Sequence, residues 1–537
     1  MIKKFEYFLY WIFILVCITS CFNDSSFNKD KIFRYNEHSN ISSLDPAFSS
    51  TLRNIWPVNQ LFNGLVQLDD SLNIKPDLSK SWRISEDGET YTFKIKKNIF
   101  FHKSIVFGKD STRNVNAFDF EYSFKRLQNP KLASPGAWVL NNVDDFKALN
   151  DSVFLIKLKS PFSAFLGILS MKYCSVVPKE AVEYYKTKFG KNPIGTGPFK
   201  FKKWEENIKL VLRKNNLFFE KDGKGNNLPY LEAVSITFLP DKKSEFMEFA
   251  QNKIDFINSI DSSFKDQLLN INGDLKKEYR NSINLLTGPY LNTEYIGFFL
   301  GDKESVLQNK KLRLAINYGI DKKKMMKYLR NNIGYPANNG FIPLGLQKDL
   351  TKGFQYDLKK SLQLINEYKF ETKQKSIEII LSSDANYLDI VEFIQRELLK
   401  IGVNVKINIL PPSSLRQAKS NGKLEMFRAS WIADYPDSQN YLSLFYSKNL
   451  APNGPNYTHF KNEYYDLLFL KMMEESSKKV RDKLSSKLDS LIIDEAPIVP
   501  LYYDKIMRFS QKNIIGLETN PINQLNLKKV YKRETTF

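Results

Sequence analysis

The segment Phe427–Asp437 holds the residues of this chain best suited to bind a charged ligand. It reads FRASWIADYPD and places a cation, Arg428, and a carboxylate, Asp434, six residues apart around Trp431. The rest of the segment is apolar enough to be buried, and a buried charge without a partner costs several kcal/mol. Either the two charges pair with each other, or they meet the charged groups of a ligand.

Motifs typical of hydrolases, zinc enzymes and nucleotide-binding proteins are missing from the sequence. It contains no H-E-x-x-H spacing, no G-x-S-x-G turn and no Walker loop. The three histidines, His38, His102 and His459, are far apart in the chain, so we interpret each as a surface or hydrogen-bonded residue. We therefore expect no metal, no cofactor and no catalysis. A hydrolase built from scattered Ser, Asp and Lys side chains is the remote alternative.

The first residues are typical of an export signal. After two lysines, the apolar run Phe8–Ile18 is shorter than the roughly 20 residues of a membrane-spanning helix. The residues Ile18–Cys21 (ITSC) resemble the lipobox of bacterial lipoproteins, which implies cleavage before Cys21 and lipidation of that cysteine. Residues 1–20 are then a lipoprotein signal peptide and residues 21–31 a polar tether. A plain signal peptide is the alternative.

Cysteine content and charge narrow the class of protein further. With Cys21 acylated, Cys174 has no partner, so the fold must hold without disulfides, which a chain of 537 residues can do. The formal net charge is +20, but basic and acidic residues are mixed along the chain and form no nucleic-acid-binding module. We therefore expect a lysine-rich solvated surface and no nucleic-acid partner.

Strand and helix patterns alternate along the chain, which predicts a mixed α/β fold. Residues 89–101 alternate as a strand, and Asn116 is placed to cap a helix. The pattern from Leu388 to Ile401 predicts a helix that Gly402 ends, and residues 403–409 follow as a strand. The apolar residues behind these patterns are Tyr91, Phe93 and Ile95; Phe120, Phe124 and Leu127; Leu388, Val391, Ile394, Leu398 and Ile401; and Val403, Val405, Ile407 and Ile409.

Six groups of residues follow one another along the chain: SLDP (43–46), DGETYTF (87–93), AFDF (117–120), GTGPF (195–199), LRLAI (312–316) with Asp321, and APIVPLY (496–502). Taken together, these motifs resemble the extracellular solute-binding proteins of family 5, the oligopeptide- and dipeptide-binding lipoproteins of ABC transporters. The resemblance covers nearly all of the mature chain. Within one motif, we expect Gly195 and Gly197 to permit a tight turn with unusual backbone angles and Pro198 to restrict the backbone after it.

The resemblance implies an α/β fold of two lobes, the periplasmic binding protein fold of type II, cluster C-like, with an extra small domain. Lobe 1 is expected to comprise residues 32–62, 188–285 and 489–537, accessory domain II residues 63–187, and lobe 2 residues 286–488. It further implies a monomer that captures a peptide between its lobes and delivers it to ABC permease subunits. Such a protein is held in the periplasm or at the cell surface, and a lipid anchor is its only membrane contact.

The resemblance also assigns roles to the two charges of the opening segment. In the family, the acid at the place of Asp434 binds the free amino group of the peptide. A carboxylate in a water-poor cleft suits this role, because it pairs with an ammonium through charge-assisted hydrogen bonds. Arg428 meets a peptide carboxylate or pairs with an acid of the protein, and both interpretations stay open.

Neighbouring residues are candidates for contacts that do not depend on peptide sequence. Ser430 and Ile432 are expected to offer backbone donors and acceptors to an extended ligand, as if it were an added strand. Trp431 is expected to form a wall of the site, with a purely structural core role as the alternative. Trp138 lies in the stretch of the smaller lobe that supplies an aromatic residue to the ligand in the family.

Departures from the family pattern leave the cargo open. The cysteines that enteric oligopeptide binders carry at the places of Asn292 and Ile432 are absent, as is a tryptophan near Pro412, and Ser50 stands where longer-peptide binders can carry an acid. Relatives of this fold carry nickel chelates, haem, glutathione or sugars. The same scaffold with a non-peptide solute is therefore the main alternative.

Overall fold

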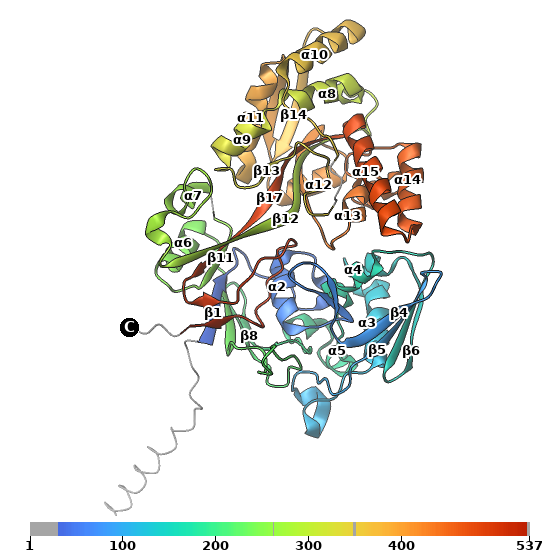
Figure 1. The fold of residues 1–537 in the computed structure, drawn as a ribbon, viewed down its shortest axis with the longest axis vertical. Coiled ribbons are helices and arrows are strands. Elements are labelled where there is room, and N and C mark those ends of the chain that lie inside the picture. The colour runs from blue at the N-terminus through green and yellow to red at the C-terminus, as the bar shows by residue number, and fades with distance from the viewer. Residues whose placement is uncertain (1–30, 261, 347–350, 534–537) are drawn as a thin grey trace, which may run out of the picture.

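The computed structural model describes residues 31–260, 262–346 and 351–533, so the expected signal peptide, Cys21 and nearly all of the tether lie outside the described residues. An eleven-stranded mixed sheet runs through both lobes in the order β15-β14-β16-β12-β17-β11-β1-β10-β9-β8, with β13 paired to β17 (Figure 1). Its strands are β1 (Ile32–Asn36), β8 (Phe199–Glu205), β9 (Lys209–Lys214), β10 (Ala233–Thr237), β11 (Phe256–Asn258), β12 (Ile283–Phe298), β13 (Tyr335–Pro336), β14 (Ile377–Ser383), β15 (Val403–Ile409), β16 (Met426–Ile432) and β17 (Ile498–Gln511).

The two long strands β12 and β17 connect the lobes (Figure 1). They pair antiparallel from Ile283–Gln511 to Gly297–Ile498, and the register shifts between Pro289 and Thr293 and again after Glu294. We call the lobe that contains β11 the lower lobe, which corresponds to the expected lobe 1, and the lobe that contains β16 the upper lobe, which corresponds to the expected lobe 2. On one side of the ribbon β17 pairs with β11, and on the other side β12 pairs with β16. Because bulges locally break the ladder and let strands bend, we predict that the lobes move relative to each other at this ribbon.

The upper lobe contains the helix–glycine–strand unit that the sequence predicts. α11 (Leu388–Leu399) buries Val391, Ile394 and Leu398, and it ends two residues before Ile401. Gly402 has φ +76°, which favours glycine, and β15 then pairs in parallel with β14. The other upper-lobe helices are α8 (Lys310–Gly319), α9 (Lys322–Leu329), α10 (Leu358–Thr372), α12 (Pro412–Ser420), α13 (Gln439–Leu442), α14 (Glu463–Glu474) and α15 (Lys478–Glu495).

A separate four-stranded antiparallel sheet, β4-β5-β7-β6, lies beside the lower lobe. In β5 the predicted face of Tyr91, Phe93 and Ile95 is buried, but the strand ends at Ile95 rather than at Phe101. These strands are β4 (Ser79–Ile84), β5 (Thr90–Ile95), β6 (Val143–Asn150) and β7 (Val153–Leu158), and two short pairs join β2 (Val66–Leu68) to β3 (Ile74–Pro76) and β18 (Ile514–Ile515) to β19 (Tyr531–Lys532). The helices of this half are α2 (Leu52–Leu61), α3 (Ala117–Gln128), α4 (Phe165–Leu169), α5 (Lys179–Tyr185), α6 (Lys242–Ala250) and α7 (Ser262–Leu268).

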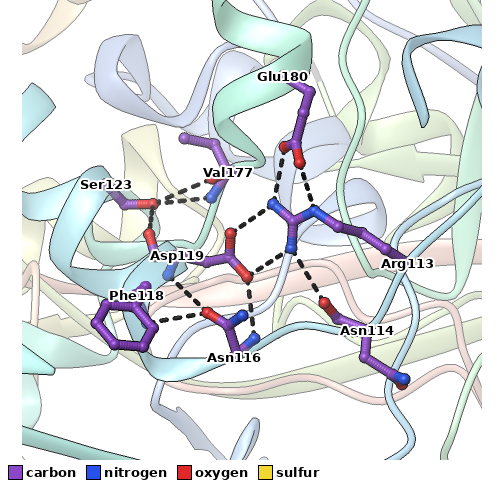
Figure 2. Close-up of polar contacts among 8 residues, drawn as sticks. All are labelled: Arg113, Asn114, Asn116, Phe118, Asp119, Ser123, Val177 and Glu180. Atoms are coloured by element: carbon purple, nitrogen blue, oxygen red, sulfur yellow. Dashed lines mark hydrogen bonds and ion pairs between the residues drawn. The ribbon is translucent and has the colours of Figure 1, made fainter. Parts of the chain in front are cut away.

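Helix α3 begins at the predicted cap. Asn116 and Asp119 form a capping box, in which each side chain accepts a backbone N–H of the other residue (Figure 2). Arg113 bridges Asp119, at 2.7 Å, and Glu180 of α5, at 2.6 Å. The same carboxylate therefore starts α3 and ties it to a second helix.

The buried apolar side chains form several clusters, which are distributed over the lobes and the four-stranded sheet. One continuous cluster includes Phe33 of the lower lobe and Phe93 of the four-stranded sheet, whereas the described part of the upper lobe contains three clusters of its own. The division of the chain into three domains stays a prediction. Over the described ranges, no helix combines the length and the apolar character needed to cross a bilayer.

The glycines of the GTGPF motif are required by close packing, which corrects the expectation of unusual backbone angles. Neither Gly195 nor Gly197 has a positive φ. An added Cβ would lie 2.1 Å from the Leu61 carbonyl oxygen at Gly195 and 2.4 Å from the Gln60 carbonyl oxygen at Gly197. The motif therefore lies directly against the last turn of α2, a helix whose first turn reaches the space between the lobes.

We expect Gly197→Ala to lower the free energy of unfolding by about 1–3 kcal/mol, because the new methyl group must displace backbone. Urea unfolding monitored by tryptophan fluorescence measures this change. Gly223→Ala is the matched control, since an added Cβ there meets nothing within 4 Å. Equal midpoints for the two variants would contradict the packing argument.

Candidate functional site

A pocket of about 380 Å³ lies between the lobes. Residues 49–52 and Ile55, at the start of α2, form its lower wall, and residues 170–173 form a second wall. Residues 432–434, at the end of β16, bring the upper lobe to the same space. The segment that the sequence selected for chemistry therefore faces the other lobe across a pocket.

Asp434 lies in this pocket with a charge that is not neutralised by the protein. It is exposed to the solvent of the pocket, yet protein surrounds it on most other sides. This burial raises the pKa of its carboxyl to about 6, and a hydrogen bond from Asn440 opposes the rise. Among the described residues, Asp434 forms no ion pair: its carboxylate has no lysine, arginine or histidine nitrogen within 4.0 Å.

Arg428 does not pair with Asp434 but with an acid from the neighbouring strand. Its guanidinium lies 2.5 Å from Glu294 Oε2 and 3.9 Å from Asp384 Oδ2. The side chains of Arg428 and Glu294 are 11% and 4% exposed, so this is a buried ion pair. The guanidinium carbon also lies 3.3 Å from the ring centroid of Tyr387. Arg428 Nε, which is buried, has no hydrogen-bond acceptor among the described residues.

Sequence reasoning missed Glu294 and the charges around it. Burial raises the pKa of Glu294, the Arg428 charge opposes this, and the Asp504 charge adds to the rise. Asp504 itself pairs with Arg330 at 3.1 Å, and Arg330 lies over the Tyr502 ring. The available sequence signal was a carboxylate directly before Tyr295 and Ile296, in the half of β12 that the structure buries completely.

The outer edge of β16 is open where it approaches the pocket. β14 pairs with β16 only at Met426 and Phe427, and the described strands do not extend this side of the ladder further. On the other side, the Ala433 N–H donates to the Leu291 carbonyl at 2.9 Å. Because backbone groups alternate in direction along an antiparallel pair, those of Ser430 and Ile432 point away from β12, toward the open edge.

The aromatic candidates occupy different places. Trp431 is half-buried against the upper-lobe core, and its Nε1–H donates to Asn440 Oδ1 at 2.8 Å. Asn440 thus contacts both Trp431 and Asp434. Trp138 is 40% exposed in a short helix next to the four-stranded sheet and is not among the residues that line the pocket. Ser50 and Ile432 do line it.

The three histidines contact neighbouring groups of the protein, as the sequence predicted, and Cys174 is buried. This cysteine is free, and burial raises the pKa of its thiol to about 12. His38 Nδ1 lies 3.7 Å from Glu245 Oε2, His102 Nε2 lies 3.0 Å from the Gly197 carbonyl oxygen, and His459 Nε2 lies 3.0 Å from the Ala451 carbonyl oxygen.

Two lobes joined by a strand ribbon, with a pocket between them, define a solute-binding protein of the two-lobed periplasmic type. Residues 73–453 match the model of the bacterial extracellular solute-binding proteins, family 5, and the chain belongs to that family. It is 24% identical over 528 residues to the dipeptide-binding protein DppE of Bacillus subtilis, an alignment covering 93% of this chain and 91% of the relative.

Solved structures share the fold across nearly the whole chain. The periplasmic binding protein DppA of Helicobacter pylori, in complex with the peptide STSA, superposes with a TM-score of 0.79 at 25% identity, over 94% of this chain and 98% of that one. NikZ of Campylobacter jejuni, in complex with Ni(L-His), has a TM-score of 0.75 at 24% identity, over 92% and 97%. The same fold therefore holds cargoes of different chemistry.

Proposed function

We propose that this protein captures peptides with a free amino group between its lobes and delivers them to an ABC permease. The observation that carries the proposal is the Asp434 carboxylate, which lies in the interlobe pocket without an ion-pair partner within 4.0 Å among the described residues. A peptide ammonium supplies the missing charge, and both groups gain from pairing where water is scarce. The resemblance to DppE and DppA supports a peptide as the cargo.

An extended peptide continues from this anchor along the open edge of β16. The outward-facing backbone groups of Ser430 and Ile432 are suited to bind a ligand main chain as an added strand would. Such bonds are common to all peptides, so they give affinity without reading side chains. Trp431, held by Asn440, supplies a fixed wall beside that edge.

Arg428 has a more limited role in this proposal. Glu294 already compensates its charge, so a peptide carboxylate is not needed to stabilise it. Within the described part of the chain its Nε lacks an acceptor, but this atom is buried, so a longer peptide along β16 reaches Arg428 only if neighbouring side chains move. The amino-group contact at Asp434 is therefore the common requirement, and a contact with Arg428 depends on peptide length.

Peptide binding couples to movement of the lobes because the pocket has walls from both. A ligand that contacts α2 and β16 together stabilises the closed arrangement over the open one. The permease would receive the closed form. In this proposal the protein is held at the membrane by lipidated Cys21 and performs no catalysis of its own.

A non-peptide cargo on the same scaffold is the competing assignment. NikZ shows that this fold accommodates a nickel complex. An anionic chelate or a neutral sugar gains nothing from a carboxylate in the pocket, whereas an ammonium does. Asp434 therefore favours a cationic terminus. Recovery of the bound peptide intact after incubation, by mass spectrometry, separates both assignments from a hydrolase.

Binding should depend on pH through Asp434. Its pKa of about 6 in the empty protein means that the carboxyl is mostly ionised at pH 7 and mostly protonated at pH 5. Because an ammonium binds the ionised form, we expect the affinity for a free-amine peptide to fall about tenfold from pH 7 to pH 5. Titration calorimetry at the two pH values measures this.

The matched control for the pH experiment is Asp434→Asn, whose residual binding should not change between pH 7 and pH 5. An N-acetylated peptide should likewise lack the pH dependence, because it presents no ammonium. If the acetylated and free peptides lose affinity in parallel as the pH falls, another group of the protein is titrating and the amino-group assignment fails.

A further inference from the structure

The interlobe pocket contains a second charge that the proposed function does not use. Among the described residues that line the pocket, Asp434 is the carboxylate and Lys172 is the cation, and the other lining side chains are uncharged at neutral pH. Lys172 and Asp434 do not form an ion pair with each other within 4.0 Å. The pocket is therefore dipolar, with opposite charges held apart by space that a ligand can fill.

Lys172 stands where the pocket meets a smaller polar cavity of about 30 Å³, which has room for about one water molecule. Lys172, Ser170 and Gln524 line both spaces. Lys172 therefore separates the pocket from the cavity and belongs to the wall of each. It is not part of the edge of β16 to which the peptide main chain was assigned.

Charges around this small cavity do not balance. Lys528 pairs with Glu220 at 2.7 Å. The Asp77 carboxylate accepts hydrogen bonds from the Asn63 amide, at 2.9 Å, and from a backbone N–H, and among the described residues it has no lysine within 4.0 Å. Lys96 donates to the backbone carbonyl of Asp77 rather than to its carboxylate.

Three lysines, Lys96, Lys172 and Lys528, thus surround two carboxylates, Asp77 and Glu220. Burial lowers the pKa of Lys172 to about 8, although the Asp77 charge acts in the opposite direction. A cation in such a place gains when an anion is added next to it, because its own carboxylate neighbour is too far to form a salt bridge.

We propose that Lys172 binds a carboxylate of the same ligand whose amino group Asp434 binds. This inference rests on the proposed function and specifies its substrate class. One added carboxylate equalises the charges around the cavity, and the ligand that supplies it is a zwitterion whose charges lie within the length of one pocket. That carboxylate is the C-terminus of a dipeptide or an acidic side chain on the first residue of a longer peptide.

Selection from an unbiased mixture tests this preference across many candidate cargoes at once. The purified protein is incubated with a synthetic library of dipeptides to pentapeptides, and retained peptides are identified by mass spectrometry. We expect the wild type to enrich dipeptides or peptides with Asp or Glu at the first position. Lys172→Met should lose that enrichment, and Lys172→Arg should retain it in part. The proposal would be overturned if the peptides retained by the wild type showed no preference for dipeptides or for Asp or Glu at the first position.

Calorimetry with defined probes identifies the source of the carboxylate. The probes are Ala-Ala, Ala-Ala-amide and Glu-Ala-amide. A C-terminal carboxylate predicts that Lys172→Met weakens Ala-Ala at least about tenfold and leaves both amides unchanged, and a side-chain carboxylate predicts the same loss for Glu-Ala-amide instead. An equal loss for all three probes, or no loss for any of them, contradicts a carboxylate contact.

Two controls separate this proposal from folding defects and from failure of the proposed function. Lys224→Met removes a lysine from an exposed turn and should behave as the wild type toward every probe. N-acetyl-Ala-Ala tests Asp434 alone: if it binds as tightly as Ala-Ala, the amino-group assignment fails, whereas the effect of Lys172→Met on Ala-Ala relative to its amide still decides the present inference.

Discussion

Asp434→Asn is expected to weaken the binding of free-amine peptides by at least about 30-fold, because the ligand ammonium then enters a poorly hydrated pocket without a counter-charge. The substitution keeps the size of the side chain and its capacity for hydrogen bonding to Asn440. Calorimetry with a free peptide and its N-acetylated form measures the loss. For the acetylated peptide, the wild type and the variant should bind equally.

The empty form of the Asp434→Asn variant should be at least as stable as the wild type at pH 7. A carboxyl whose folded pKa, about 6, lies above its unfolded value binds protons more readily in the native state. The empty wild type therefore gains stability as the pH falls from about 6 toward 4, and the variant lacks this gain. If the empty variant instead melts well below the wild type at pH 7, the carboxylate supports the fold rather than a ligand.

Glu294→Gln should cause the largest loss of stability among the substitutions considered, about 3–5 kcal/mol, because it removes the nearest counter-charge of the buried Arg428 and leaves only Asp384, at 3.9 Å. Urea unfolding of the ligand-free protein measures the change. The double variant Glu294→Gln/Arg428→Met should recover most of it, since removing both charges also removes the cost of burying them.

The exposed pair Glu378–Lys406, at 2.8 Å, is the matched control for this buried pair. Its side chains are 54% and 63% exposed, so solvent screens the interaction and Glu378→Gln should leave the urea midpoint nearly unchanged. Midpoints that shift equally for Glu294→Gln and Glu378→Gln would show that burial does not strengthen the Arg428 pair.

The roles expected of Arg428 and Asp434 illustrate where sequence reasoning stops. Two charges six residues apart can pair with each other, with the rest of the protein or with a ligand, and the sequence left all three open. The partner of Arg428 is 134 residues away in the chain and reaches it only because β12 and β16 lie side by side. Lys172 was not identified either, because nothing in its local sequence shows that it shares a pocket with Asp434.

Local structure, by contrast, was determined by the sequence itself. Asn116 caps α3 and Gly402 follows α11 with a positive φ, since capping and backbone conformation depend on residues within one or two turns. The motifs also indicated the family correctly. Tertiary structure alone decided which charges are compensated, why Gly197 must lack a side chain, and which strand edge stays open. Each of these depends on contacts between segments distant in sequence, whose energies no local pattern contains.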